Sequence, residues 1–218
     1  MFLDKLCKTN SNLIQIAVHM HQQKQILPDT YVVDVDRFLE NAKVILQKAN
    51  EQNIELYYML KQIGRNPYLA KELEKIGYKG AVVVDFKEAE VMMKNHLHIA
   101  HAGHLVQIPS MMINQLVAYG CDYITVYSYE KLVEVNEAAK KIGLVQKVCV
   151  RVIGENDRIY SGQTAGFYLN QLEELVQKSK DLKYIEIAGV DNFPCFLYDE
   201  VTKEIQAQEN LHTVFKAK

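Results

Sequence analysis

The sequence lacks the features that mark secreted, membrane or nucleic-acid-binding proteins. Its first residues, MFLDKLCKTNSNLIQIAVHMHQQ, are interrupted by Lys, Asn, Gln and His and contain neither a continuous apolar segment nor a small-residue cleavage site. The formal net charge is only -2, so there is no excess of Lys and Arg to neutralise a phosphate backbone. We therefore expect a cytoplasmic protein that binds neither a membrane nor a nucleic acid.

Cysteine is scarce, and so are the residues that build linkers. The 4 cysteines, Cys7, Cys121, Cys149 and Cys195, lie far apart and form no CxxC pair. Their spacing argues against a zinc knuckle or a thioredoxin-type motif, and reduced thiols fit a cytosolic protein. No stretch rich in Pro, Gly or Ser divides the chain, which favours a single, large folded domain.

What the sequence does contain is a regular alternation of two patterns. From Thr30 onward, short β-branched runs alternate with amphipathic stretches, which is typical of βα units around a parallel sheet. Asp36 is expected to cap the first helix, and Pro67 and Gly77 are expected to begin and end the second. The predicted extended runs are residues 30–36, 54–62, 80–85, 98–106, 123–128, 147–153 and 184–193.

The number of these repeats predicts an α/β barrel that is incomplete. If the run at residue 30 is set aside, about six βα units remain in residues 29–218, whereas a closed (β/α)8 TIM-type barrel has eight. Residues 1–28 are expected to form an N-terminal helical arm with an apolar face. The final ENLHTVFKAK is typical of the interior of a helix. We expect the last two barrel strands and a C-terminal β domain to be absent from this chain.

Lys61 is the first candidate for chemistry, because it follows the apolar run IELYYML. In βα barrels the functional residues lie at the carboxyl ends of the strands. If the side chain points inward, burial favours its neutral amine, which is the form that attacks an aldehyde. If it points outward, Lys61 is a solvated surface lysine, and the pattern alone leaves both interpretations open.

Several sequence blocks resemble a known family, the fold-type III pyridoxal-5′-phosphate (PLP) enzymes. The stretch YVVDVDRFLENAKVILQKANEQNIELYYMLKQIGRNP is similar to their opening segment, which ends in the cofactor lysine. The blocks KQIGRNP, AVVVDFKEA, GHLVQIP, TVYSYEK and AGVDNFPCFLYDE resemble, in this order, the YhfX-like branch of predicted amino-acid racemases, whose barrel is of the alanine racemase N-terminal domain type. This resemblance covers about residues 28–200 and implies a PLP-binding barrel in which Lys61 holds the cofactor as a Schiff base.

The resemblance also implies a reaction, namely racemisation or epimerisation of a small amino-acid substrate. PLP supplies the electron sink, and the protein must add a proton carrier on each face of the substrate carbon. In alanine racemase one carrier is the cofactor lysine and the other is a tyrosine of the partner subunit, so a homodimer is expected for the full-length form. The alternatives are a non-catalytic PLP-binding homeostasis protein, a PLP-dependent decarboxylase of the same fold, and a βα barrel without PLP.

Further candidates for cofactor binding lie at the ends of the other strands. His104 and Tyr127 are expected either to line the pocket or to make structural hydrogen bonds. The resemblance implies a basic residue near the cofactor on the fifth strand, for which Arg151 is the candidate. It also implies a flat side chain against the PLP ring after the sixth strand, where Asn192 or Phe193 stands.

Two arginines are candidates for binding the substrate. Arg65 follows Lys61 by four residues and could pair with a carboxylate. Arg158 lies in the loop GENDRIYSGQTAGF, which departs from the Asp-x-Gly-Met-Gly-Arg pattern usual in the family. No metal site is expected, because His98, His101 and His104 would alternate between the two faces of a strand.

Overall fold

The computed structural model describes residues 2–218, and these form two compact units. One unit comprises the residues up to Leu56 together with Lys71–Tyr78, and the other comprises Tyr57–Ala70 together with Lys79–Lys218. The predicted division of the chain at residue 28 stays a prediction.

The first unit is helical and contains α1 (Phe2–Thr9), α2 (Ser11–Gln22), α3 (Val35–Glu51) and most of α4 (Pro67–Ile76). Asn10 accepts a hydrogen bond from the backbone of Leu13 at the start of α2, and its amide donates to Asp34 at 2.6 Å. These bonds link the beginning of α2 to the beginning of α3.

The expected extended run at residues 30–36 is wrong, because α3 already begins at Val35. Asp34, not Asp36, caps this helix, since its carboxylate accepts a hydrogen bond from the backbone N–H of Arg37 at 3.1 Å. A capping carboxylate inside a valine-rich run therefore outweighs the β propensity of its neighbours.

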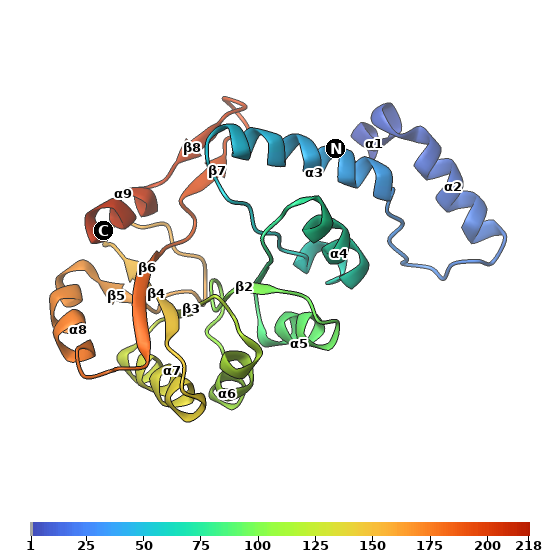
Figure 1. The fold of residues 1–218 in the computed structure, drawn as a ribbon. Coiled ribbons are helices and arrows are strands. Elements are labelled where there is room, and N and C mark those ends of the chain that lie inside the picture. Colours follow the sequence, from blue (N-terminus) through green and yellow to red (C-terminus); the bar gives the residue numbers. More distant parts are fainter. Residues whose placement is uncertain (1) are drawn as a thin grey trace. The chain divides into compact units, whose positions relative to one another are not determined.

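The second unit is built on a parallel sheet, which confirms the predicted α/β fold (Figure 1). Within residues 2–218 this is a 6-stranded sheet in the order β1-β2-β3-β4-β5, with β6 paired to β4. All of these neighbours run parallel, and Tyr58 extends the sheet beyond β1 by a single bridge to Ala81. The strands are β1 (Ala81–Val83), β2 (Ile99–Ala102), β3 (Tyr123–Val126), β4 (Gln146–Ile153), β5 (Phe167–Tyr168) and β6 (Ile185–Asp191).

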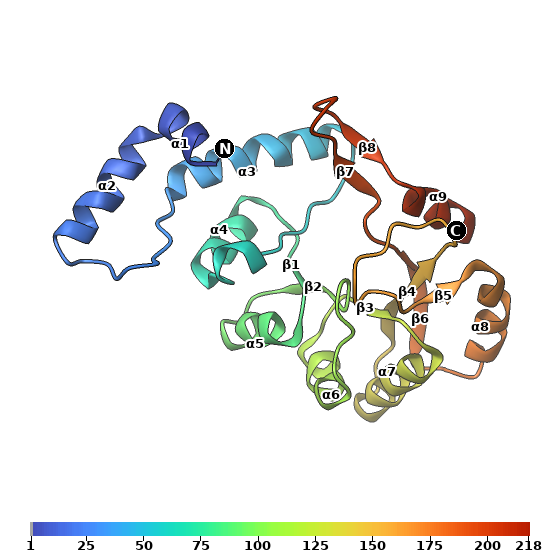
Figure 2. The same cartoon turned by 180° about the vertical axis from the view of Figure 1, so that it is seen from behind.

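Helices connect successive strands and pack along the outer side of this sheet, as Figure 2 shows from behind. They are α5 (Phe86–Lys94), α6 (Ser110–Tyr119), α7 (Tyr129–Ile142) and α8 (Leu172–Ser179), the last preceded by a 3-10 turn, η2 (Leu169–Gln171). Asp85 and Ser128 cap α5 and α7 from the ends of the preceding strands. Between sheet and helices lies a buried apolar core that includes Val83, Ile124 and Leu132.

Two predicted strands are shorter than expected. The run at residues 54–62 has only the bridge at Tyr58, and Lys61 instead begins a 3-10 turn, η1 (Lys61–Ile63). The run at residues 98–106 ends as β2 at Ala102, so His104 lies in the following loop. Both runs lie beside β1 as expected, but their backbone pairing with β1 ends before Lys61 in the first run and before His104 in the second.

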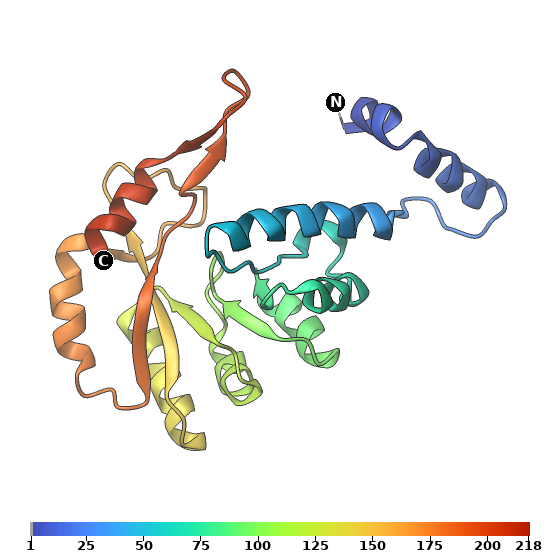
Figure 3. The same ribbon diagram turned by 45° about the horizontal axis from the view of Figure 1, so that its top comes forward.

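Beyond β6 the chain forms a small hairpin and a last helix. The strands β7 (Phe196–Tyr198) and β8 (Ile205–Ala207) pair antiparallel, and α9 (Glu209–Ala217) then returns to the carboxyl ends of β4 and β6, as Figure 3 shows. In the described part of the chain, no helix is long and apolar enough to cross a membrane.

Candidate functional site

Lys61 lies where the chain leaves the edge of the sheet. Tyr58 donates its N–H to Gly80 at 3.0 Å and accepts from Val82 at 2.8 Å, which makes it a one-residue strand parallel to β1. Leu60 is buried, and Lys61 then begins η1 with its side chain exposed. Because parallel strands share one carboxyl edge, Lys61 stands at the edge where barrel sites are found.

A buried carboxylate holds the segment before Lys61 in place. Glu88 is only 1 % exposed, and its two carboxylate oxygens accept from the backbone N–H of Leu60 at 3.1 Å and of Val84 at 2.8 Å. Both donors are backbone groups just beyond the end of a strand segment. Glu88 therefore replaces the ladder hydrogen bonds that the short Tyr58 strand does not supply.

The segment after Lys61 is held by a second acidic residue of the same turn. The guanidinium of Arg65 donates to Asp85 at 2.9 Å, and both side chains are about one-quarter to one-third exposed. Gly64, with φ of 70°, provides the left-handed residue that lets the chain turn here. Arg65 thus orders the loop of Lys61 through Asp85, and its proposed contact with a substrate carboxylate stays a prediction.

The amine of Lys61 has no hydrogen bond or ion pair with any residue in the described part of the chain. Two lysines on helices of the same unit, Lys94 of α5 and Lys131 of α7, are instead paired with glutamates at 3.7 and 2.5 Å. The backbone on both sides of Lys61 is therefore fixed by hydrogen bonds, while its amine is available to a reactant.

A second group of polar side chains gathers at the carboxyl edge of the central strands. His104 donates from Nδ1 to the carboxylate of Asp191, at 2.9 and 3.0 Å from its two oxygens. The hydroxyl of Thr125 donates to the same carboxylate at 3.1 Å, and His101 Nε2 lies 2.6 Å from the Thr125 oxygen. These four residues come from β2, the loop after it, β3 and β6.

The electrostatics of this group follow from its burial. Burial alone would raise the pKa of Asp191, but the hydrogen bond from His104 and the electrostatic interactions with His104, His101 and Arg151 outweigh it and lower the pKa. Burial lowers the pKa of His101 to about 4, against the pull of Asp191 and together with the repulsion of His104. Asp191 is therefore a carboxylate and His101 a neutral imidazole near neutral pH.

Four of the predicted cofactor-binding residues meet around this carboxylate. The hydroxyl of Tyr127 donates to the carbonyl of His104 at 2.9 Å, and burial raises the pKa of this phenol. The ring of Phe193 packs edge-on against His104 at 5.6 Å, and Arg151 donates from Nη2 to the Phe193 carbonyl at 3.1 Å. The sequence predicted these residues separately, and the fold brings them together.

Arg151 also carries a donor that is buried without a partner. The residue is 2 % exposed, and its Nη1 has no hydrogen-bond acceptor in the described residues. An unsatisfied guanidinium nitrogen in the interior is costly, which favours a site that an anionic or polar ligand atom completes.

Asn192 and Arg158 belong to a different group. The Asn192 amide donates to Asp157 at 2.6 Å and to the carbonyl of Asn210 at 3.4 Å, and its oxygen accepts from Phe193 N–H and from the Asn210 side chain. The backbone of Arg158 is bonded to Asn210, and its guanidinium lies 5.6 Å from the Tyr160 ring. Asn192 thus fastens α9 and has no free hydrogen-bonding atom, so its contact with a cofactor stays a prediction.

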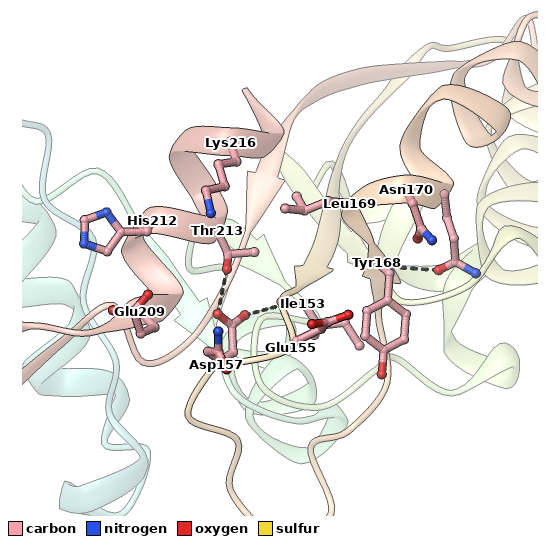
Figure 4. Close-up of a pocket in the computed structure, with 13 residues that line it drawn as sticks. Ile153, Glu155, Asp157, Tyr168, Leu169, Asn170, Glu209, His212, Thr213 and Lys216 are labelled. Carbon is pink, nitrogen blue, oxygen red and sulfur yellow. Dashed lines mark hydrogen bonds between the residues drawn. The ribbon is translucent and has the colours of Figure 1, made fainter.

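A cavity of about 570 Å³ lies beside this second group, and Figure 4 shows its lining. It is formed by the turn after β4, by η2 and by α9, with Asp157 bonded to Thr213 at 2.6 Å and to Gly154 N–H at 2.8 Å. None of the predicted site residues lines it. A smaller hollow of about 360 Å³ includes Tyr127.

The sequence alone did not single out Asp191, Thr125, His101 or Glu88 as parts of the site. Asp191 ends the sixth predicted strand, and that position is the one signal by which it could have been chosen. The three histidines of β2 and its neighbours bind separate partners, His98 to Asp122, His101 to Thr125 and His104 to Asp191. Within residues 2–218 no cluster of three His, Cys, Asp or Glu side chains has the arrangement of a metal site.

Comparison with known families decides how this chain is classified. The family described as "Alanine racemase, N-terminal domain" matches residues 33–217. The chain belongs to this family. Its members are fold-type III PLP enzymes, so the resemblance seen in the sequence blocks is confirmed.

One curated relative extends over the whole chain. The uncharacterized protein YhfX of Escherichia coli (strain K12) is 44% identical over 218 residues, which are 100% of this chain and 56% of that protein. The chain therefore spans about half the length of this relative, and the resemblance to the YhfX-like branch is confirmed.

Solved structures share the fold. Diaminopimelate decarboxylase from Helicobacter pylori, complexed with L-lysine, matches with a TM-score of 0.63 at 17% identity, over 79% of this chain and 45% of that one. Alanine racemase of Clostridium difficile 630 gives 0.53 at 22%, over 72% and 39%. D-threonine aldolase from Filomicrobium marinum gives 0.56 at 17%, over 73% and 42%. At these identities the matches show the PLP-binding barrel fold alone.

Proposed function

We propose that this chain forms the cofactor-binding part of a PLP-dependent amino-acid racemase or epimerase in which Lys61 bears the cofactor. The observation that carries the proposal is the unpaired amine of Lys61, held at the carboxyl edge of the sheet by the Glu88 hydrogen bonds. Membership of a PLP-binding family supports it, because that family attaches its cofactor to a lysine at this place in the fold.

The residues present fit the chemical needs of PLP. The aldehyde requires a primary amine without a competing partner, which Lys61 provides. The aromatic ring requires a flat neighbour, and Phe193 beside His104 provides one. The phenolic and phosphate oxygens require donors, and Arg151 Nη1 is a buried donor with no acceptor of its own. We propose that these three residues hold the cofactor.

The protein's own residues would then act through position and proton transfer. When bound, PLP supplies an electron sink for the charge left when a bond to the substrate's α-carbon breaks. The Lys61 amine would hold the cofactor and would take or give a proton at that carbon. Glu88 and the Arg65–Asp85 pair fix the backbone on both sides of Lys61, which limits the positions that the amine can take relative to the substrate carbon.

Racemisation is proposed over decarboxylation on the strength of the sequence blocks, since the fold serves both. An alternative with the same attachment chemistry is a non-catalytic PLP-binding protein. These functions differ in what happens to an L-amino acid. A racemase or epimerase forms the other stereoisomer, a decarboxylase releases carbon dioxide, and a binding protein leaves the amino acid unchanged.

The test combines cofactor attachment with product analysis. The full-length form, titrated with PLP, is expected to develop a visible absorption band and to convert members of an amino-acid panel to the opposite stereoisomer on chiral chromatography. Lys61→Ala is expected to abolish both signals, because no other residue replaces the attacking amine.

Lys87→Ala is the matched control, since Lys87 is an exposed lysine of α5 in the same unit. It is expected to retain the band and the conversion. A band of undiminished strength in Lys61→Ala, or conversion of the amino acids only to carbon dioxide and the corresponding amines, would overturn the proposal.

A further inference from the structure

The surrounding hydrogen bonds determine which atom donates and which accepts in the His104–Asp191 pair. Asp191 is a carboxylate and only accepts, so the Thr125 hydroxyl donates to it and the Thr125 oxygen must accept from His101 Nε2–H. His104 likewise donates from Nδ1 to Asp191. A neutral His104 therefore has its proton on Nδ1 and a free lone pair on Nε2.

The free nitrogen of His104 is open to a reactant. The His104 side chain is 20% exposed, while Asp191 behind it is 9% exposed. His104 Nε2 makes no hydrogen bond in the described part of the chain, yet it is not among the buried polar atoms without a partner. Nε2 thus reaches solvent while Nδ1 is held in the interior, which is the orientation a proton carrier needs.

His104 and Lys61 share one edge of the sheet. Lys61 follows the Tyr58 bridge, His104 follows β2, and β1 is the single strand between them. Neighbouring strands lie about 4.8 Å apart, so these two chain segments are separated by about 10 Å. Lys61 and His104 therefore stand near one another at the carboxyl edge, with only the end of β1 between their chain segments.

We infer that His104 is a proton carrier for the substrate of this site, and that Asp191 positions it by holding Nδ1–H. The inference rests on the proposed function and adds to it a second residue of this chain that moves a proton at the substrate carbon. In the step, the Nε2 lone pair would form an N–H bond as the substrate's α-C–H bond breaks, and bound PLP would supply the sink for the C–H electron pair. In the reverse direction the imidazolium returns the proton from Nε2.

A second histidine–aspartate pair on the same strand serves as an internal control. His98 and Asp122 lie 2.7 Å apart, and each is 43% exposed. His98 precedes β2 and Asp122 precedes β3, so the pair stands at the amino edge of the sheet, away from the carboxyl edge where Lys61 lies. A change at His98 removes a comparable histidine–aspartate hydrogen bond without touching the proposed site.

The first test uses the protein without cofactor and reads the imidazole directly. In ¹⁵N-labelled protein at mildly alkaline pH, ring ¹⁵N–¹H correlation spectra are expected to show the proton of His104 on Nδ1 and that of His101 on Nε2, with His104→Gln used for assignment. Asp191→Asn is expected to raise the Nε2–H share of His104, because an amide oxygen is a weaker acceptor than a carboxylate. An Nε2–H tautomer of His104 in the unaltered protein would refute the inference whatever the fate of the cofactor proposal.

The second test measures proton transfer with cofactor bound. Uptake of solvent deuterium at the α-carbon of an accepted amino acid, followed by NMR, is expected to fall by about 100-fold or more in His104→Gln while the visible band of the attached cofactor persists. His98→Gln is expected to change neither signal. Deuterium exchange in His104→Gln within about threefold of the rate in the unaltered protein would overturn the role of His104. That outcome would leave the cofactor proposal standing, provided that the visible band is lost in Lys61→Ala.

Discussion

Replacing Glu88 by glutamine tests how the Lys61 segment is held. Glu88 is almost fully buried and accepts two backbone N–H groups, from Leu60 at 3.1 Å and Val84 at 2.8 Å. Glutamine keeps the shape but has one oxygen and one amino group, so at least one of the two N–H groups then faces a donor. One buried N–H left without its acceptor costs about 1–3 kcal/mol, so we expect Glu88→Gln to lower the free energy of unfolding by about 2 kcal/mol.

The assay is urea unfolding together with hydrogen exchange. Glu90→Gln, a change on the same helix at a residue 3.7 Å from Lys94, is the control and is expected to cost less than about 0.5 kcal/mol. The amide of Leu60 or of Val84 is expected to exchange about tenfold faster in Glu88→Gln, as follows from about 1.4 kcal/mol of lost protection. Equal stability of the two variants, with unchanged exchange at both amides, would show that Glu88 does not hold this segment.

Two further predictions concern the surroundings of His104. Burial holds the pKa of His101 at about 4, whereas an unfolded histidine titrates near 6.5, so the unfolded chain gains a proton first and the free energy of unfolding falls as the pH drops through this window. The free energy of unfolding is expected to fall by about 2–3 kcal/mol between neutral pH and pH values near the lowered pKa. His101→Gln is expected to remove this fall in urea titrations. An unchanged pH dependence in the variant would contradict the low pKa of His101. Gly103 has φ of 85°, and a Cβ there would lie 2.6 Å from the Thr125 carbonyl oxygen, so Gly103→Ala is expected to unfold at a clearly lower urea concentration than Gly120→Ala, where φ is 97° but the space is open. The control carries only the backbone strain of about 1 kcal/mol, and equal midpoints would mean that the Thr125 contact relaxes freely.

The order of elements was predictable because it depends on local patterns. Alternating β-branched and amphipathic runs indicated the parallel sheet, and Pro67 begins α4 as expected. The ends of the elements depend on single hydrogen bonds and were less predictable. Asp34 moved the start of α3 to Val35, and the run before Lys61 became one bridged residue because Glu88 took over its last backbone contacts.

The site was predictable only one residue at a time. Family resemblance pointed to Lys61 and Arg151, and strand ends pointed to His104 and Tyr127. The carboxylate that connects them, Asp191, meets His104 across 87 positions of sequence and Thr125 across 66, a distance at which no periodicity carries information. The amide of Asn192 bonds to Asp157 and Asn210, and these partners meet it only once α9 has packed against the sheet, so the sequence did not indicate them; its contact with the cofactor ring stays a prediction.

The most direct measurement for the central claim is to find the residue that carries the cofactor. The protein is saturated with PLP, reduced with borohydride to make the linkage permanent, digested and analysed by mass spectrometry. The added mass is expected on Lys61, in quantity equal to the cofactor bound, and to be missing in Lys61→Ala but present in Lys87→Ala. Modification of a different lysine, or no modification at saturating cofactor, would contradict the account.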